Sequence, residues 1–359
     1  MRLVIKVGSN VLTRPDGMLD VTRLSAIVDQ VAELRAAGHE VILVSSGAVA
    51  SGRGELRDLP ADTRLDSVAA RQLFSAVGQA KLINRYYELF RDHSLHCGQV
   101  LATKENFARR SHYLNQRHCM ETMLANGVIP IVNENDTVSL SELMFTDNDE
   151  LSGLIATMMD ADKLVILSNI DGVFTGNPAD PATVLLSRVE AGDDIDRYIC
   201  ATKSSAGRGG MGSKCRISRR VASEGIEVVV ANGKRDGIIA AAVNSDPAVP
   251  MTVFVAAEGR SSRLRKWIAL SDTFAKGRVY VNAGAAEALL AGGASLLPVG
   301  VENVEGDFDA DDIVTVLTPD QRVIAWGRAT MSADEAHSVA GHSGAHPLIH
   351  ADYIYINEQ

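Results

Sequence analysis

The sequence predicts an α/β protein: a mostly parallel central sheet with helices on both faces, followed by a small β-rich domain. Short Val- and Ile-rich runs alternate with longer amphipathic stretches up to about residue 256, which is the order of β-α-β units. The composition changes at 258–275, where arginines and serines cluster, and further short strand-like runs follow. The length of 359 residues also fits two domains.

The expected strands of the main domain are short and rich in β-branched residues, which predicts burial on both faces of the sheet. They are 3–7, 40–44, 98–101, 128–132, 163–167, 226–230 and 252–255. Residues 22–37 carry apolar side chains at helical spacing, and Gly38 follows as a C-cap. Further helices are expected at 64–91, 111–126, 148–159 and 213–224.

We place the main domain at 1–257, a linker at 258–275 and the small domain at 276–359. The last of these reads as β-rich because glycine, aspartate and proline turns separate its apolar runs. Its expected strands are 279–281, 313–317, 323–330 and 353–356.

The charge balance argues against a nucleic-acid or anionic-membrane partner. The formal net charge is −10 and aromatic residues make up only 5 %. Most of the excess acid lies in 276–359, which has four basic and twelve acidic residues, whereas 1–275 has 31 and 33. RNA-binding surfaces are basic, so this distribution disfavours RNA binding by the small domain.

The cysteines and the N-terminus indicate a cytoplasmic protein. The four cysteines form no C-x-x-C pair, so we expect free, buried thiols rather than zinc or dithiol chemistry. Lys6 interrupts the apolar N-terminal stretch, which is too short for a signal peptide. No apolar run reaches the roughly 18 residues that a membrane span needs.

Two small-residue turns follow expected strands. Lys6 and Gly8 end the first strand, where the ammonium could reach a phosphate and the glycine backbone could approach it; an edge-strand lysine in water would look the same. Ser46, Gly47 and Ala48 follow the second strand, and their amides and hydroxyl suit a carboxylate or phosphate at a helix N-terminus. The same small residues would also be expected in a tightly packed turn that binds no ligand.

Polar side chains are concentrated in two further segments. Residues 132–136 (VNEND) follow a strand, and residues 146–150 (TDNDE) open a helix. So many carboxylates and carboxamides need ammonium, guanidinium or metal partners, or full solvation. An amino-acid ligand would supply the ammonium and Mg²⁺-ATP the divalent cation. The alternative is a solvated loop with Asp147 or Asn148 as an N-cap.

Residues 207–214 (GRGGMGSK) form a glycine-rich segment before an expected helix. No strand is expected directly before it, so the dinucleotide-binding fingerprint fails on context, and Ser213 between Gly212 and Lys214 breaks the Walker A pattern. Glycine amides and a first-turn lysine at a helix N-terminus still form an anion cradle. A plain surface loop is the alternative.

Four histidines near the C-terminus do not predict a metal site. Glycines and a proline between them prevent one helical face, and neither cysteines nor carboxylates complete a known ligand spacing. The histidines are His337, His342, His346 and His350.

Together these features favour phosphoryl transfer. Two lysines, two glycine-rich turns and an acidic cluster suit catalysis by positioning and charge neutralisation, and no nucleophile–base pair is evident. A carboxylate acceptor would be ionised at pH 7 and need no general base. Lys6 and Lys214 would then offset its repulsion with the γ-phosphoryl group, and Asp149 would hold both lysines.

In order and approximate spacing, these motifs resemble those of the glutamate 5-kinase family, within the amino-acid-kinase superfamily. The motifs are 6–9 (KVGS), 44–48 (VSSGA), 133–136 (NEND), 147–149 (DND) and 209–214 (GGMGSK). The C-terminal part, with 292–300 (GGASLLPVG) and 340–342 (AGH), is similar to a PUA domain. The resemblance covers essentially the whole chain.

This resemblance implies ATP-dependent phosphorylation of the L-glutamate γ-carboxylate, the first step of proline biosynthesis, with Mg²⁺ carried by ATP and no protein metal ligands. It implies Lys6, Lys214 and Asp149 as catalytic residues. The implied glutamate-binding residues are Ser46, Gly47, Ala48, Asn133, Asp136 and Asn148. The implied ATP-binding residues are Lys6, Gly8, Ser168, Asn169, Arg208, Gly209, Gly210, Met211, Gly212, Ser213 and Lys214.

The resemblance also implies feedback inhibition by proline and a homodimer or homotetramer. Three positions depart from the family pattern: Asn169 stands where Asp is frequent, Arg208 where Thr is usual and Thr146 where Gly is common. Two rival functions stay open. One is a kinase of this fold with another carboxylate or phosphate acceptor, and the other is an RNA-binding factor acting through the PUA domain.

Overall fold

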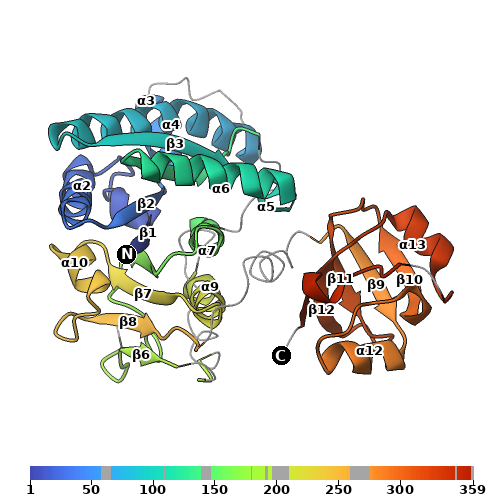
Figure 1. Cartoon of the computed structure of the whole chain (residues 1–359). Helices are drawn as coiled ribbons and strands as arrows, with labels where there is room; N and C mark the ends of the chain where they lie inside the picture. Colours follow the sequence, from blue (N-terminus) through green and yellow to red (C-terminus); the bar gives the residue numbers. More distant parts are fainter. Residues whose placement is uncertain are drawn as a thin grey trace. The chain divides into compact units, whose positions relative to one another are not determined.

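The computed structural model describes residues 1–57, 66–108, 110–138, 147–178, 180–190, 193–195, 210–258, 275–343 and 346–356. The chain divides into two compact units (Figure 1). The first is Met1–Thr103 with His118–Arg260, and the second is Lys104–Arg117 with Ser261–Gln359. The boundaries placed at 257 and 276 stay a prediction, since residues 259–274 lie outside the described part.

A mostly parallel sheet runs through the first unit. Its described strands lie in the order β3-β4-β2-β1-β5-β7-β8-β6, and every neighbouring pair is parallel except β7 and β8. They are β1 (Arg2–Val7), β2 (Glu40–Ser45), β3 (His96–Ala102), β4 (Val128–Glu134), β5 (Lys163–Ser168), β6 (Arg188–Val189), β7 (Glu227–Asn232) and β8 (Met251–Phe254). The predicted α/β class is confirmed.

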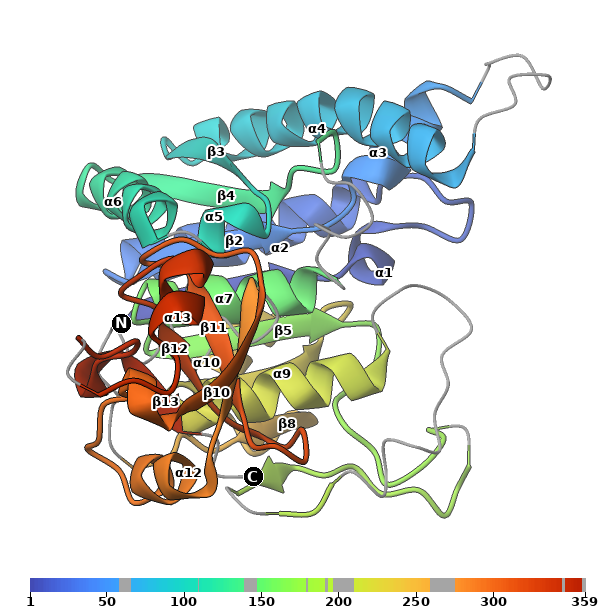
Figure 2. The ribbon, with the colours of Figure 1, turned by 90° about the vertical axis from the view of Figure 1, so that its right-hand side faces the viewer.

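Helices cover both faces of this sheet. Figures 1 and 2 show α2 (Val21–Ala36) and α10 (Ile238–Val243) on one face, and α7 (Asn148–Met158) and α9 (Met211–Ser223) on the other. Helix α4 (Ser67–Asp92) lies near the β3 end, and α6 (Arg110–Ala125) belongs partly to each unit. Among the described helices, none has the length and apolar character needed to cross a bilayer.

Side chains of β1 alternate between the two faces of the sheet, so that one face is apolar and the other carries Lys6. Leu3, Ile5 and Val7 are fully buried in the core that also contains the apolar stripe of α2. Because neighbouring side chains on a strand point to opposite faces, Lys6 lies on the face of α7 and α9. Two charged residues of β1 lie on this face, Arg2 at the start of the strand and Lys6 near its carboxyl end.

Two predictions of burial were wrong. Strand β3 was expected to be buried on both faces, but only Val100 and Ala102 are buried, because β3 pairs with β4 alone at the sheet edge. The cysteines were expected to be buried, but Cys119 is exposed on α6 and Cys97 is half-buried; Cys215 is buried. All three are free thiols, and Cys200 lies outside the described residues.

Among the described residues before 258, four short helices were not predicted: α1 (Ser9–Leu12), α3 (Ala48–Glu55), α5 (Glu105–Ala108) and α10. Helix α3 packs against α4 at very close range. A Cβ atom added to Gly52 would lie 1.8 Å from the Phe74 carbonyl oxygen, and one added to Gly78 would lie 1.8 Å from that of Ala48. The two glycines therefore let the backbones touch, which fixes the position of α3.

The second unit has its own sheet and core. The described strands follow the order β10-β9-β11-β12-β13, with only β9 and β11 parallel. They are β9 (Gly277–Val281), β10 (Val301–Gly306), β11 (Ile313–Leu317), β12 (Val323–Arg328) and β13 (Ile354–Ile356). Helices α12 (Ala283–Leu290) and α13 (Ala333–Val339) and the 3-10 turns Pro298–Gly300 and Ala351–Tyr353 complete it. The predicted small β-rich domain is confirmed, although β10 and the helices were not foreseen.

Candidate functional site

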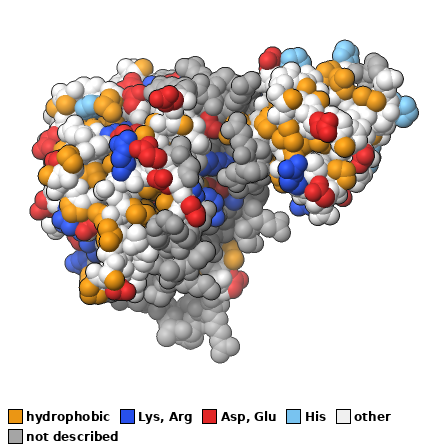
Figure 3. Space-filling view, turned by 90° about the horizontal axis from the view of Figure 1, so that it is seen from below, with side chains coloured by type: hydrophobic (Ala, Val, Ile, Leu, Met, Phe, Trp, Pro, Cys, Tyr) orange, Lys and Arg blue, Asp and Glu red, His pale blue; other side chains and the backbone are white. Residues whose placement is uncertain are grey.

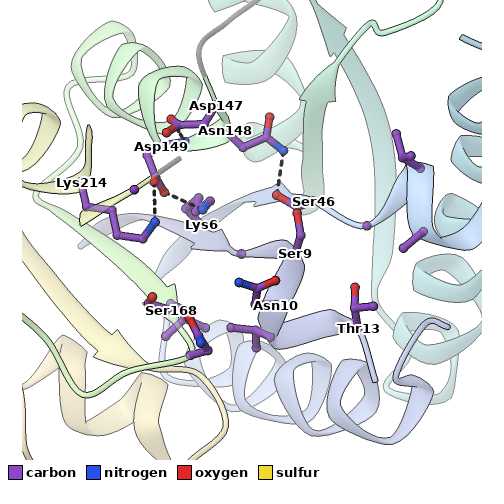
Figure 4. Close-up of a pocket in the computed structure, with 18 of the residues that line it drawn as sticks. Lys6, Ser9, Asn10, Thr13, Ser46, Asp147, Asn148, Asp149, Ser168 and Lys214 are labelled. Atoms are coloured by element: carbon purple, nitrogen blue, oxygen red, sulfur yellow. Dashed lines mark hydrogen bonds and ion pairs between the residues drawn. The ribbon is translucent and has the colours of Figure 1, made fainter. Parts of the chain in front are cut away.

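Two lysines meet on one buried carboxylate at the carboxyl end of the central strands. Lys6 Nζ, from β1, lies 2.5 Å from Asp149 Oδ1, and Lys214 Nζ, from α9, donates to Asp149 Oδ2 at 2.9 Å (Figure 4). The Asp149 side chain is 1 % exposed and those of Lys6 and Lys214 are 6 % and 11 % exposed. One carboxylate thus faces two ammonium groups, and the cluster keeps a net positive charge.

The electrostatics of this cluster favour an ionised aspartate. Burial alone would raise the pKa of the Asp149 carboxyl, but the charges and hydrogen bonds of Lys6 and Lys214 outweigh it and hold that pKa below its usual range. Burying such a group without partners would be expensive. Asp149 is therefore a fixed anion that sets the positions of both ammonium groups.

Local sequence explains why Asp149 stands there. Helix α7 begins after Asp147, whose Oδ1 accepts hydrogen bonds from the backbone amides of Asp149 and Glu150 at 2.9 and 3.0 Å. This is an N-cap, and it holds Asp149 in the first helical turn, facing β1. Thr146 lies outside the described residues, so the effect of that departure stays untested.

Asn148 links the two polar segments found in the sequence. Its Nδ2 atom donates to Ser46 Oγ at 2.9 Å and to Asn133 Oδ1 at 3.0 Å, and the Ser45 carbonyl oxygen lies 3.4 Å away (Figure 4). Gly47 follows with a φ of +105°, a left-handed conformation that favours glycine, and caps α3. The turn at 46–48, Asn133 and Asn148 are thus adjacent.

The acidic residues after β4 have a partner that the sequence did not reveal. Arg71, on α4, donates to Asp136 Oδ1 at 2.8 Å and to Glu134 Oε2 at 3.1 Å, and Ser75 Oγ donates to Asp136 Oδ2 at 3.2 Å. From the same helix face, Gln79 Oε1 accepts from Asn133 Nδ2 at 2.8 Å. Polar residues spaced four apart in the expected helix, Arg71, Ser75 and Gln79, were the available signal in the sequence. This spacing does not indicate which strand the polar face of the helix contacts.

The glycine-rich segment and the end of β5 form the other side of the site. Helix α9 begins at Met211, two residues before the expected start, and its N-cap Gly210 offers no capping side chain. Ser168, Asn169 and Leu167 lie across from it and line the same cavity. Arg208 and Gly209 lie outside the described residues, and Gly212 and Ser213 fall within the first turn of α9.

Gly8 sits where β1 meets the end of β5. Its amide donates to the Leu167 carbonyl oxygen at 3.1 Å, and a Cβ atom here would lie 2.9 Å from that oxygen and 3.5 Å from Lys6 Nζ. A larger residue would therefore press on the neighbouring strand, while its Cβ would only touch the lysine. Glycine at this position keeps the backbone open beside the ammonium.

One cavity of about 1200 Å³ joins these groups. Most of the sequence-predicted site residues that the structure describes line it, whereas Gly212 and Ser213 do not. Those that line it are Lys6, Gly8, Ser46, Gly47, Ala48, Asn133, Asp136, Asn148, Asp149, Ser168, Asn169, Gly210, Met211 and Lys214. Ser9, Asn10 and Thr13, on and after α1, also line it and were not predicted (Figure 4). Lys6, Asp149 and Lys214 lie between the half with Asn133 and the half with Ser168.

No metal cluster is evident in the described ranges. Among those residues, no three or more His, Cys, Asp or Glu side chains gather closely enough to hold an ion. In Figure 3, the histidines visible on the second unit lie apart from one another. The cavity contains carboxylates, but Arg71 or the two lysines already pair with three of them, Glu134, Asp136 and Asp149.

Comparisons with known proteins agree with this arrangement. The amino acid kinase family matches residues 1–232 and the PUA domain matches residues 277–347. Glutamate 5-kinase from Bacteroides thetaiotaomicron is 56 % identical over 99 % of this chain and 98 % of its own. Glutamate 5-kinase from Chlorobaculum tepidum is 43 % identical over 99 % of this chain and 97 % of its own.

Solved structures show the same fold at low identity. An isopentenyl phosphate kinase is 19 % identical with a TM-score of 0.51, and covers 71 % of this chain and 100 % of its own. Carbamate kinase from Giardia lamblia, bound to AMP-PNP, is 16 % identical with a TM-score of 0.51, and covers 71 % and 98 %. These two structures support the fold alone.

Proposed function

The chain belongs to the amino acid kinase family and, within it, to the glutamate 5-kinases, and we propose that it transfers the γ-phosphoryl group of ATP to the γ-carboxylate of L-glutamate. The observation that carries this proposal is the pair of lysines fixed on Asp149 between the two halves of one cavity. A kinase needs positive charge at the point where two anionic substrates meet.

The reaction needs no proton transfer. A γ-carboxylate oxygen attacks the γ-phosphorus, the bond from that phosphorus to the bridging oxygen breaks, and ADP leaves with the electron pair. The acceptor is already ionised at pH 7, since a glutamate side chain has a pKa of about 4.3. The absence of a base from this scheme agrees with a site whose central groups are two lysines and an aspartate that they hold ionised.

Lys6 and Lys214 would lower the barrier by charge neutralisation. Like charges at ~4 Å repel by ~1 kcal/mol in water and by several times more where water is scarce. Two ammonium groups at that point offset this repulsion and stabilise the charge that develops on the transferred group. Asp149 would orient them, so that neither lysine has to be ordered during transfer.

We assign the glutamate half of the cavity to Ser46, Gly47, Ala48, Asn133, Asp136 and Asn148. The hydrogen bonds from Asn148 to Ser46 and Asn133 support this assignment, because they hold three polar groups around one space. Asp136, which Arg71 and Ser75 hold in place, brings a carboxylate to this space, and a carboxylate suits the α-ammonium group of an amino acid.

We assign the nucleotide half to Lys6, Gly8, Ser168, Asn169 and the segment from Arg208 to Lys214. The uncapped N-terminus of α9 supports this, since free backbone amides at a helix N-terminus attract phosphate oxygens. Mg²⁺ would enter as the ion that accompanies ATP. Bound there, it would offset part of the negative charge of the triphosphate.

The remaining predictions keep their basis in the sequence and the family. They are the place in proline biosynthesis, inhibition by proline, a homodimer or homotetramer, a cytoplasmic location and the absence of nucleic-acid binding.

Trapping of the acyl phosphate tests the function. With ATP, Mg²⁺ and L-glutamate, hydroxylamine should intercept the product as γ-glutamyl hydroxamate. N-acetylglutamate, carbamate and a nucleoside monophosphate, offered separately, should give no comparable ATP turnover. If ATP turnover with L-glutamate gives no hydroxamate, or if one of the other acceptors is turned over faster, the assignment of L-glutamate as the acceptor is wrong. A salt-sensitive micromolar complex with tRNA would revive the RNA-binding alternative.

A further inference from the structure

The glutamate half of the cavity is lined by two arginines in different states. Arg71 is held by Glu134 and Asp136. Arg53, in the last turn of α3, also lines the cavity, and its guanidinium carbon lies 5.7 Å from the centre of the Phe74 ring. Within the described residues, no acidic side chain pairs with Arg53.

The position of Arg53 follows from the geometry of α3. This helix starts at the turn that carries Ser46 and Gly47, and Val49, Ala50 and Arg53 line the cavity from one face of it. Long side chains on a helix lean towards its N-terminus, which directs Arg53 back along the cavity towards that turn. Phe74, from the facing side of α4, supports the planar guanidinium.

Apart from the polar groups of the turn at 46–48, one charged group of the acceptor still lacks a charged partner. L-glutamate carries a γ-carboxylate, an α-ammonium and an α-carboxylate, and the two carboxylates lie at opposite ends of its carbon chain. Lys6 and Lys214 take the reacting end, while Glu134 and Asp136 can take the ammonium. Lys6 and Lys214 already pair with Asp149. Arg71 already pairs with Glu134 and Asp136, so none of these three cations remains to bind an α-carboxylate.

We propose that Arg53 binds the α-carboxylate of the acceptor and so makes the enzyme specific for an α-amino dicarboxylic acid. The proposal rests on the proposed kinase activity. A guanidinium presents two parallel N–H donors to a carboxylate, which gives both orientation and affinity. Since the contact is far from the transferred group, it contributes to binding rather than to the rate of transfer.

The test compares L-glutamate with 4-aminobutanoate, which is glutamate without its α-carboxylate. Arg53→Ala should raise the KM for glutamate by about 30-fold, the range expected for a lost charged hydrogen bond, and keep kcat within about threefold. Inhibition by 4-aminobutanoate should stay within about threefold of wild type, because that ligand has no group for Arg53. Arg53→Lys should recover part of the affinity, as it keeps the charge without the paired donors.

A matched control is Arg85→Ala. Arg85 is an exposed arginine on α4 that pairs with Glu88 and does not line the cavity, so its loss should leave the KM unchanged. A KM for glutamate in Arg53→Ala within threefold of wild type overturns the proposal, and so does an equal loss of affinity for both ligands. If Arg53→Ala fails to fold, Arg53→Gln is judged by the same limits. Glutamate turnover by the wild type tests the proposed function separately.

Discussion

Ser213, in the first turn of α9, donates from its Oγ to Asp147 Oδ2 at 2.7 Å, while the other oxygen of Asp147 caps α7. One carboxylate therefore ties together the N-termini of the two helices that carry Asp149 and Lys214. The relative position of the Asp149 and Lys214 side chains depends on this link.

Ser213→Ala should lower kcat several-fold. The variant removes the hydrogen bond to Asp147, so α9 is less firmly held and Lys214 spends less time on Asp149. Ser223→Ala is the matched control, since the Ser223 hydroxyl donates to the Arg220 carbonyl oxygen at the far end of α9. Steady-state kinetics with both substrates checks this, and equal kcat values for the two variants would contradict it.

Asp149→Asn should lower kcat by at least about tenfold and change the KM for glutamate less. Asparagine cannot neutralise two ammonium groups, and its own NH₂ group would face one of them. Asp246→Asn is the control, because Asp246 accepts from Ala248 in an exposed turn. An unaltered kcat in folded Asp149→Asn would remove Asp149 from the mechanism.

The stability contributed by Asp149 should depend on pH in a defined direction. Its pKa is lowered on folding, so its contribution is present above the ordinary pKa of about 4 and is lost as the pH falls through the folded value. The difference in free energy of unfolding between wild type and Asp149→Asn should be about 3–5 kcal/mol near pH 7 and shrink below about pH 4. Urea unfolding at several pH values measures it. A constant difference would contradict the lowered pKa.

Gly78→Ala should destabilise the protein by at least about 2 kcal/mol and reduce activity. Its Cβ atom would collide with the Ala48 carbonyl oxygen at 1.8 Å, which forces α3 and the turn at 46–48 away from α4. In Gly284→Ala, on α12, the nearest atom to the new Cβ is 3.7 Å away, and a gain of about 0.5–1 kcal/mol is expected. Thermal unfolding of both variants gives their Tm values. Similar Tm shifts in Gly78→Ala and Gly284→Ala would exclude close packing at Gly78 as the cause.

Arg235→Ala should raise the KM for ATP several-fold and leave the KM for glutamate unchanged. Arg235 bonds both oxygens of Asp171 at 2.8 Å, and Asn232 donates to the same carboxylate at 2.9 Å. These contacts join the end of β7 and the residues after it to the segment that follows Ser168 and Asn169. Arg85→Ala again serves as control. An equal rise in both Michaelis constants would point to a general loss of structure.

Sequence reasoning predicted the long strands and helices well because their apolar periodicity is strong. Helix α3 was missed because alanine, serine and glycine give it little amphipathic signal, and its position comes from the contact with α4. Strand β10 was missed because only Val301 and Val304 are buried in it. Burial of β3 was overestimated because an apolar run does not show which strand ends a sheet.

The site was predicted to the extent that its residues lie in short local motifs. Lys6, Asp149 and Lys214 each stand in a recognisable segment, and their convergence follows from the shared edge of a parallel sheet. Arg71 and Arg53 were not foreseen, because nothing local to a helix indicates the loop or cavity that it faces. Such pairings depend on how α3 and α4 pack, which is a tertiary property.

Strand β1 lies inside the sheet, between β2 and β5. On the ribosome it is the first strand made, yet its second edge stays open until residue 168 has emerged, and Lys214 comes later still. Until then, the nascent chain exposes an apolar strand edge and carries Asp149 with one of its two counter-charges missing. An N-terminal fragment that stops before α9 is therefore a poor independent folding unit. Strand β1 gains its second neighbour and Asp149 its second counter-charge only when β5 and α9 have both been synthesised.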